Sequence, residues 1–214
     1  MNSPVRPPRQ VPITFIVIAA FAAAIGLWLG QRFLAAPAQP KLQNAVLYPS
    51  PRAIPDFHLT QTNGAPLTLD AWRGRWDIVY FGYSSCPDVC PTTLATFKSV
   101  WRDLQARGLT DKVRFNFISV DPQRDTPELL GKYVSYFNPD FVAATGSDDE
   151  LTRLTHSLGL IYSRTTDANG TIEVDHSGSA VIVDPDGKLI GLFRPPFDAP
   201  AVVSDMTMLM SSAK

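Results

Sequence analysis

Cys86 and Cys90 are the only two cysteines of this 214-residue chain, and three residues separate them. A cysteine thiolate is both a nucleophile and a soft metal ligand, so a close pair can form a disulfide or share a metal ion. A spacing of four residues across a loop and a first helical turn lets both sulfurs face one point. We therefore expect a redox-active pair or a metal site here, with two buried structural thiols as the alternative.

The sequence around the cysteines is typical of a strand, a loop and a helix in that order. Residues Trp76–Phe81 are mainly aromatic or β-branched, which predicts a short buried strand. Pro91 suits the first helical position, and apolar residues recur at helical spacing over 92–107, up to Gly108. A helix N-terminus carries partial positive charge, so we expect Cys90 to be the thiol whose pKa is lowered most.

The uncharged, apolar sequence near the N-terminus predicts a membrane-spanning segment at residues 11–31. Residues 11–31 carry no charge, and about 20 helical residues cover the roughly 30 Å of a bilayer core. Arg6 and Arg9 precede this segment in a short tail, residues 1–10, so we expect a cytoplasmic tail and a globular part outside the cytoplasm. A cleaved signal peptide is the alternative, since Ala36–Ala38 resembles a cleavage site, but the apolar run is longer than in such signals.

Residues 32–52 contain four prolines and little periodicity, which predicts an extended linker outside the core. Residues 53–214 are then expected to form one globular domain, in a chain that is 45% hydrophobic. The 19 basic residues less Arg6, Arg9 and Arg32 leave 16 against 20 acidic residues. This negative balance argues against nucleic-acid binding.

From residue 53 the pattern alternates between strands and helices. The predicted elements are a hairpin over 54–69 with a turn at Asn63-Gly64, strands at 113–120, 141–145 and 160–163, helices at 127–137 and 147–158, a turn at Ala168–Gly170, a closing hairpin over 179–193 and a final helix at 199–210. This order predicts an α/β fold with a partly parallel central sheet flanked by helices. Ligands gather at the carboxyl ends of strands in such sheets, where the cysteine loop and the 121–127 loop both fall.

Three histidines are candidates for a third ligand. His58 lies in a predicted strand and His156 on a predicted helix, and each is expected to be an ordinary surface residue. His176 lies in a polar turn just before the 179–183 strand, from which a side chain can reach a neighbouring loop. Periodicity alone leaves open whether His176 is a ligand.

Three segments resemble the Sco/SenC family of thioredoxin-like copper proteins. They are FGYSSCPDVCP at 81–91, SVDPQRDTP at 119–127, and VDHS at 174–177 followed by VDPDG at 183–187. The resemblance covers about residues 53–210. It implies a thioredoxin-like fold and copper ligation by Cys86, Cys90 and His176. Ser84 and Ser85 stand where many relatives carry Thr and His, but these positions are not ligands.

The resemblance also implies a function, a metallochaperone that receives copper from an upstream donor and delivers it to the binuclear centre of cytochrome c oxidase subunit II. The expected location is the inner (cytoplasmic) membrane, crossed once, with the copper domain in the periplasm, rather than the mitochondrial inner membrane. Two thiolates favour Cu(I) and an imidazole also suits Cu(II), while Zn(II) is the alternative metal. A thiol-disulfide oxidoreductase that reduces the cysteines of that copper site, or a copper sensor, remains an alternative function.

Charged residues near these motifs have expected roles other than metal binding. Asp88, between the cysteines, is expected to be a solvated loop acid rather than a ligand. Asp121, Arg124 and Asp125 are expected to form an ion-paired scaffold, with partner docking as the alternative. Asp175 is expected to orient the His176 ring by accepting a hydrogen bond from it.

Overall fold

The computed structural model describes residues 12–34, 41–166 and 172–212. Contacts within the chain define two compact units, residues 1–40 and 41–214. The predicted turn at Ala168–Gly170 lies outside the described residues.

The first unit contains one helix, α1 (Ile13–Leu34), within its described residues. Its segment Ile13–Gly30 has a mean hydropathy of 2.3 and is long and apolar enough to cross a membrane. The apolar helix predicted at 11–31 is therefore present, and it continues to Leu34.

The second unit is built on an eight-stranded mixed sheet with the strand order β1-β10-β9-β4-β5-β6-β2-β3, and β7 pairs with β8 in a separate ribbon. The strands are β1 (Ala45–Ala53), β2 (His58–Gln61), β3 (Pro66–Thr68), β4 (Trp76–Gly82), β5 (Val113–Ser119), β6 (Val142–Thr145), β7 (Tyr162–Thr166), β8 (Ile172–His176), β9 (Ala180–Val183) and β10 (Lys188–Phe193). The helices are α2 (Val89–Ala106), α3 (Pro127–Phe137), α4 (Asp148–Ser157) and α5 (Ala199–Ser212), with 3₁₀ turns at Leu69–Trp72 and Thr110–Lys112.

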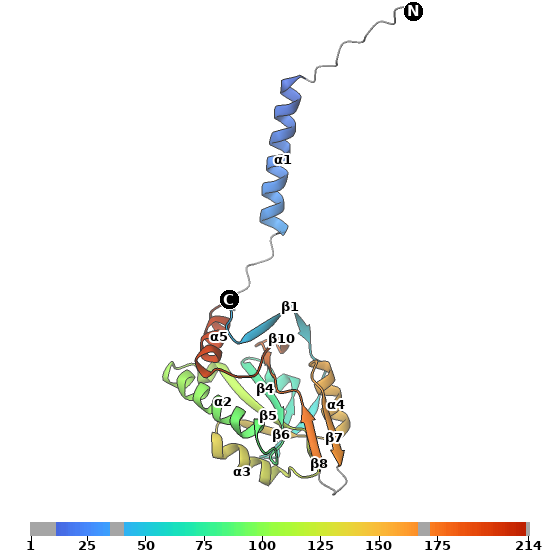
Figure 1. The fold of residues 1–214 in the computed structure, drawn as a ribbon, viewed down its shortest axis with the longest axis vertical. Coiled ribbons are helices and arrows are strands. Elements are labelled where there is room, and N and C mark those ends of the chain that lie inside the picture. The colour runs from blue at the N-terminus through green and yellow to red at the C-terminus, as the bar shows by residue number, and fades with distance from the viewer. Residues whose placement is uncertain (1–11, 35–40, 167–171, 213–214) are drawn as a thin grey trace, which may run out of the picture. The chain divides into compact units, whose positions relative to one another are not determined.

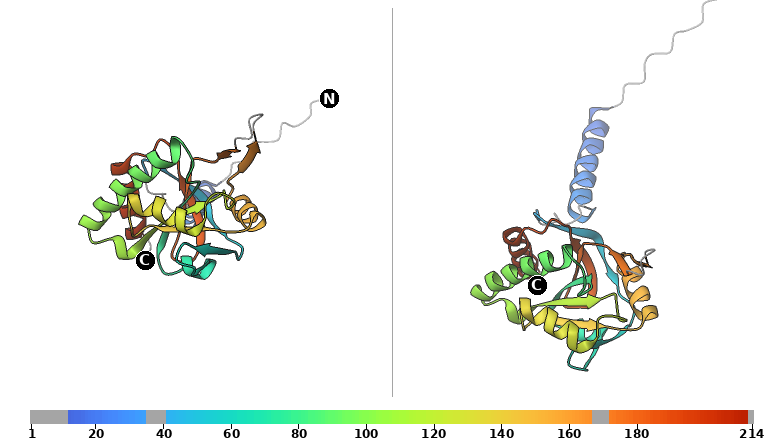
Figure 2. Two further views of the ribbon diagram at one scale, coloured as in Figure 1. Left: turned by 90° about the horizontal axis from the view of Figure 1, so that it is seen from below. Right: turned by 60° about the horizontal axis from the view of Figure 1, so that its bottom comes forward.

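The helices cover both faces of this sheet. Helices α2, α3 and α5 lie on one side and α4 lies on the other (Figures 1 and 2). The β4–β5 and β5–β6 pairs are parallel, and the other pairs of the large sheet are antiparallel. The predicted α/β fold with a mixed central sheet flanked by helices is confirmed.

Strand β4 lies at the centre of this sheet, which explains its nearly continuous apolar sequence. Every residue of β4 is buried, because β9 and β5 flank it and helices cover both faces. It ends at Gly82, and the neighbouring β5 ends at Ser119. The Val120 N–H donates to the Gly82 carbonyl at 2.9 Å. The two loops that follow these strands therefore start at the same edge, as predicted.

The prediction of an extended linker over residues 32–52 is wrong in its second half. Residues from Ala45 onward form β1, which pairs antiparallel with β10 at the edge of the sheet. Pro49 and Pro51 fall between Leu47 and Arg52, where the register of this pair shifts. An edge strand with an irregularity tolerates proline because it does not need every N–H for pairing. Proline content alone therefore placed the domain boundary too late.

Two other predicted boundaries also shift. Helix α2 begins at Val89 rather than at Pro91, so Cys90 lies in its first turn. Strand β7 covers 162–166 instead of 160–163. Both differences are about two residues, which is the usual uncertainty of element ends.

A buried carboxylate fastens the start of the second unit to its last helix. Asp205 on α5 has no exposed surface, and its oxygens accept backbone N–H bonds of 2.8–3.1 Å from Gln43, Asn44 and Ala45. Hydrogen bonds to a charged acceptor contribute about 1.5–3 kcal/mol each. Asp205 therefore fixes the chain as it enters β1.

Asp205→Asn replaces one accepting oxygen by an NH₂ group that faces backbone donors. We expect the free energy of unfolding to fall by about 1–3 kcal/mol, which lowers the Tm of the full-length protein in detergent by about 3–8 °C. Glu128→Gln is the matched control, because the Glu128 side chain is 80% exposed. Circular dichroism melts of both variants provide the measurement, and equal melting temperatures would contradict a role for Asp205 in fastening the chain.

Candidate metal centre

The two cysteines occupy different parts of one short connection. Cys86 lies in the loop after β4, and Cys90 lies in the first turn of α2. Both are buried and both are free thiols, with 8% of Cys86 and none of Cys90 exposed. The fixed ends of β4 and α2 therefore place both side chains at the carboxyl edge of the central strand.

His176 reaches the cysteines from a separate ribbon. It is the last residue of β8 and pairs with Tyr162 of β7. The prediction that His176 lies in a polar turn is therefore wrong. The ligand atoms of Cys86, Cys90 and His176 all lie within 4.8 Å of one another. The structure thus brings together the three residues that the family resemblance implied, although 86 positions separate Cys90 from His176.

The separations suit one shared metal ion. The Cys90 Sγ lies 3.4 Å from the His176 Nε2. Two ligands bound at about 2.0 and 2.3 Å in a tetrahedral arrangement lie about 3.5 Å apart. The donor set, two sulfurs and one imidazole nitrogen, suits a thiophilic transition metal.

The His176 ring is oriented by a backbone carbonyl. Its Nδ1 lies 3.3 Å from the Ser177 carbonyl oxygen, which can only accept, so Nδ1 carries the proton and Nε2 carries the lone pair. The prediction that Asp175 accepts this bond is therefore wrong. Burial lowers the pKa of His176, although the Ser177 carbonyl and the Asp175 charge partly offset it. The ring is neutral at neutral pH and can bind a metal.

The two thiols differ in acidity, in the opposite order to the prediction. Burial raises the pKa of the Cys90 thiol to about 12. Burial also acts on Cys86, but interactions with the backbone N–H groups of Asp88 and Cys90 and with the side chains of Cys90 and Tyr83 together outweigh it and lower the pKa of this thiol. The backbone N–H groups around the start of α2 thus favour the thiolate of Cys86 in the preceding loop, while the Cys90 sulfur packs against Gly82 at the end of β4.

The inward position of the Cys90 sulfur requires a glycine opposite it. A Cβ added at Gly82 would lie 2.8 Å from the Cys90 Sγ and 3.0 Å from the ring of Phe117. Real Cβ atoms do not approach a neighbour so closely, so a side chain here must displace the sulfur or the ring. Gly82 therefore supports the position of one candidate ligand.

Two tyrosines beside the cysteines were missed by the sequence analysis. Burial raises the pKa of both Tyr80 and Tyr83, and the nearby cysteines add to the increase. Both rings meet the His176 ring edge-on, at centroid distances of 5.7 and 6.1 Å. The available signal was their position at the end of the strand that leads into the first cysteine.

The loop after β5 braces the cysteine loop. The Asp125 carboxylate accepts hydrogen bonds from the backbone N–H of Ser84 at 2.9 Å and from the hydroxyls of Ser84 and Ser119. Arg124 forms an ion pair with the buried Asp121, and its guanidinium lies over the Tyr83 ring. The predicted ion pair is present between Asp121 and Arg124, and Asp125 supports the cysteine loop through hydrogen bonds instead.

The remaining predicted residues lie apart from the three ligand atoms. His58 is exposed on β2, and its backbone N–H donates to Glu150. His156 is exposed on α4, and Asp88 is exposed at the start of α2. Within the described part of the chain, the group of metal-ligating side chains includes none of these residues.

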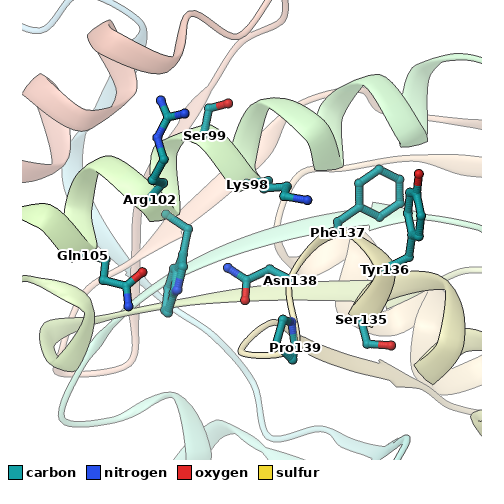
Figure 3. Close-up of a pocket in the computed structure, with 10 residues that line it drawn as sticks. Lys98, Ser99, Arg102, Gln105, Ser135, Tyr136, Phe137, Asn138 and Pro139 are labelled. Atoms are coloured by element: carbon teal, nitrogen blue, oxygen red, sulfur yellow. The ribbon is translucent and has the colours of Figure 1, made fainter.

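Cavities border α2 on more than one side. One of about 320 Å³ opens beside the site and is lined by Tyr80 and His176 together with Val89 and Phe197. Another of about 460 Å³ lies between α2 and α3, where Trp101, Lys98 and Tyr136 line it (Figure 3). None of the candidate ligands lines the second cavity, whereas His176 lines the first.

Comparison with known proteins decides the family. The family model described as SCO1/SenC matches residues 47–211. This chain belongs to the SCO1/SenC family. A Stutzerimonas stutzeri protein assigned as copper-binding is 39% identical to this SCO1/SenC member over 153 residues, which cover 72% of this chain and 74% of that protein.

Solved Sco structures with copper bound are similar to this SCO1/SenC chain. ScoI of Bradyrhizobium japonicum with copper bound is 32% identical, with a TM-score of 0.66 over 73% of this chain and 99% of that chain. Yeast Sco1 with copper bound is 28% identical, with a TM-score of 0.70 over 77% and 91% of the two chains. The expected thioredoxin-like fold is thereby confirmed for this SCO1/SenC chain.

Because alkylation consumes the thiolate, the acidity order predicts which cysteine of this SCO1/SenC chain reacts first. In the reduced protein, the Cys86 rate should rise with pH through a midpoint below the usual thiol pKa of about 8.5. Cys90 should remain unmodified at the same pH values. Limiting iodoacetamide followed by peptide mass spectrometry measures both, with urea-unfolded protein as the control in which the two cysteines react alike. Faster modification of Cys90 in the folded protein would contradict the assignment.

Gly82→Ala should weaken metal binding at the Cys90 sulfur, because the new methyl group displaces it. Overpacking costs about 1–3 kcal/mol, so we expect roughly tenfold weaker binding of Co(II), a spectroscopic probe of such sites. Gly131→Ala in α3 is the control, since its Cβ would lie at an ordinary 3.4 Å from Thr62. Equal Co(II) affinities for the two variants would show that Gly82 does not position the site.

Proposed function

We propose that this chain is a membrane-anchored copper metallochaperone, which binds copper through Cys86, Cys90 and His176 and delivers it to cytochrome c oxidase. One observation carries the proposal. Two sulfurs and one imidazole nitrogen lie within 4.8 Å of one another, at the same edge of a fold whose solved relatives contain copper. Copper is the cargo of this function, so the site must both hold it and release it.

The donor set suits that cargo in both oxidation states. Two thiolates favour Cu(I), and the neutral His176 nitrogen also accommodates Cu(II). Within the described residues, the metal-ligating group has three members, which leaves a coordination position for an incoming ligand. Such a ligand can attach before the chaperone releases its own, so copper never becomes free in solution. Zn(II) would fit the same donors and is the competing metal.

The cellular setting of the proposal follows from the N-terminal unit. Helix α1 is long and apolar enough to span the inner membrane once, and the positive charges of Arg6 and Arg9 in the sequence before it favour a cytoplasmic N-terminus and a copper domain in the periplasm. The domain receives copper from an upstream donor in that compartment. Its acceptor is subunit II of cytochrome c oxidase, at the binuclear copper centre, as the family membership suggests.

A second function is favoured by the same two sulfurs. The Cys86 and Cys90 sulfurs are close enough to form a disulfide after a small movement, and the lowered pKa of Cys86 suits thiol exchange. A thiol-disulfide reductase that prepares the cysteines of the oxidase copper site would use this pair. Such a reductase would not need His176, because an imidazole takes no part in sulfur exchange.

His176→Ala therefore separates the two functions. If the chain delivers copper, this variant should bind Cu(II) about 100-fold more weakly and should fail to support oxidase assembly. It should still form the Cys86–Cys90 disulfide. His156→Ala is the matched control, because His156 is exposed on α4 away from the site.

Three measurements on the full-length protein decide the outcome. They are copper content after anaerobic loading, the thiolate-to-Cu(II) absorption band, and oxidase activity in cells that carry each variant. Normal oxidase activity with His176→Ala would contradict copper delivery. If Cys86→Ala abolished activity in the same cells, the reductase would become the better explanation.

A further inference from the structure

The cavity of about 460 Å³ between α2 and α3 has aromatic walls and a positively charged rim. Trp101 lines it with a largely buried ring, 8% exposed, whose indole N–H donates to Asp140 at 3.1 Å. Tyr136 and Phe137 at the end of α3 line it too, and their rings meet edge-on at a centroid distance of 5.3 Å (Figure 3). Tyr136 is 80% exposed, so an apolar surface is open to a ligand here.

The charged residues in the lining of this cavity are both basic. Lys98 and Arg102 lie one helical turn apart on α2 (Figure 3). Lys98 takes part in none of the ion pairs between described residues. Arg102 pairs with its chain neighbour Asp103 at 3.1 Å, but 75% of its side chain remains exposed. The rim therefore attracts negative charge, although the protein as a whole has a formal net charge of −1.

The segment after α3 adds a hydrogen-bond donor to this rim. The Asn138 Oδ1 accepts from the backbone N–H of Asp140 at 2.9 Å, and its NH₂ group has no partner among the described residues. An amide NH₂, an ammonium and a guanidinium all donate hydrogen bonds. A carboxylate only accepts them, so it is the group that this rim suits best.

These features match a protein interface better than a pocket for a small molecule. A small-molecule pocket encloses its ligand, whereas Lys98, Arg102 and Tyr136 are exposed side chains around one buried ring. Trp, Tyr and Arg are enriched in interface hot spots, where a buried anchor is surrounded by a rim that excludes water. Lipid recognition uses clusters of about four to eight basic residues, so two basic residues do not favour a membrane surface.

We propose that this cavity is a docking site for a partner protein that inserts an aromatic side chain flanked by carboxylates. The aromatic side chain packs against Trp101 and Phe137, and the carboxylates bind Lys98 and Arg102. Charge complementarity is the reason for an acidic partner. The inference goes beyond the proposed function, because none of the candidate copper ligands lines this cavity.

The position of the cavity along α2 gives such docking a purpose. Lys98 follows Cys90 by eight residues in α2, which is about 12 Å along a helix. A protein interface of ordinary size covers about 800 Å² on each partner, a patch with a radius of about 16 Å. A partner anchored at the cavity therefore extends to the start of α2, beside the candidate metal centre.

A synthetic peptide with a central phenylalanine between runs of aspartate and glutamate tests the site. Isothermal titration calorimetry measures its binding to the full-length, metal-free protein in an uncharged detergent. We expect saturable binding in about 50 mM NaCl that weakens about fivefold in about 500 mM NaCl, because salt screens exposed charges. Replacing the phenylalanine by alanine, or every acid by lysine, should weaken binding at least about tenfold.

Surface variants locate the binding without disturbing the core. Lys98→Glu combined with Arg102→Glu should weaken peptide binding at least about tenfold, because two attractions become repulsions. Tyr136→Ala should weaken it roughly tenfold through lost apolar contact. Lys188→Glu is the matched control, since Lys188 is half-exposed on β10 and does not line the cavity. Cys86→Ala should bind the peptide as the wild type does, and circular dichroism melts check that every variant is folded.

Each other outcome overturns the docking site. One is the absence of saturable binding, and another is equal affinity of the wild type and the Lys98→Glu/Arg102→Glu variant. Displacement of the peptide by phosphatidylglycerol added to the micelles would assign the surface to lipid instead. A wild-type dimer in sedimentation that this double variant dissociates would assign the cavity to a second copy of the chain. Loss of copper binding with intact peptide binding would refute the proposed function alone and support the docking site.

Discussion

The parallel pairing of β4 with β5 is the constraint on which the candidate site depends. Because both strands run in the same direction, the loops that follow them begin at one edge of the sheet. One loop carries Cys86, and the other carries Asp125, whose carboxylate binds the backbone of Ser84. The metal centre is thus supported by a second loop that contributes no ligand. Rigid strands fix the starting points, and buried hydrogen bonds fix the loops themselves.

The sequence predicted most of the fold because its signals are local. Strand β4 is apolar apart from Asp77, α2 has a regular apolar face, and Ser147 caps α4 by accepting from the Glu150 N–H. The start of β1 was missed because its prolines resemble those of a linker. Only the pairing with β10, more than 130 residues away, makes that segment a strand, and such pairing leaves little mark on the segment's own sequence.

The candidate site was predictable in its ligands but not in its electrostatics. Residue types, motifs and a family resemblance pointed to Cys86, Cys90 and His176, and the structure places them together. The acidity of the two thiols depends on where each sulfur points. Spacing along the chain shows that Cys90 is near a helix start, but not that its sulfur lies against Gly82 while the backbone N–H groups of Asp88 and Cys90 lower the pKa of Cys86. The role of the Ser177 carbonyl was hidden for the same reason.

The ribbon that carries His176 has a thermodynamic consequence for metal loading. A two-stranded ribbon on its own is marginally stable, and β7 and β8 pair only with each other among the described strands. A metal ion bound to Cys90 and His176 would join chain positions 86 residues apart. It would act as a reversible cross-link that restricts the unfolded chain much as a disulfide does. A ribbon that folds more stably without metal would therefore bind the metal more tightly, and bound metal would in turn stabilise the folded ribbon.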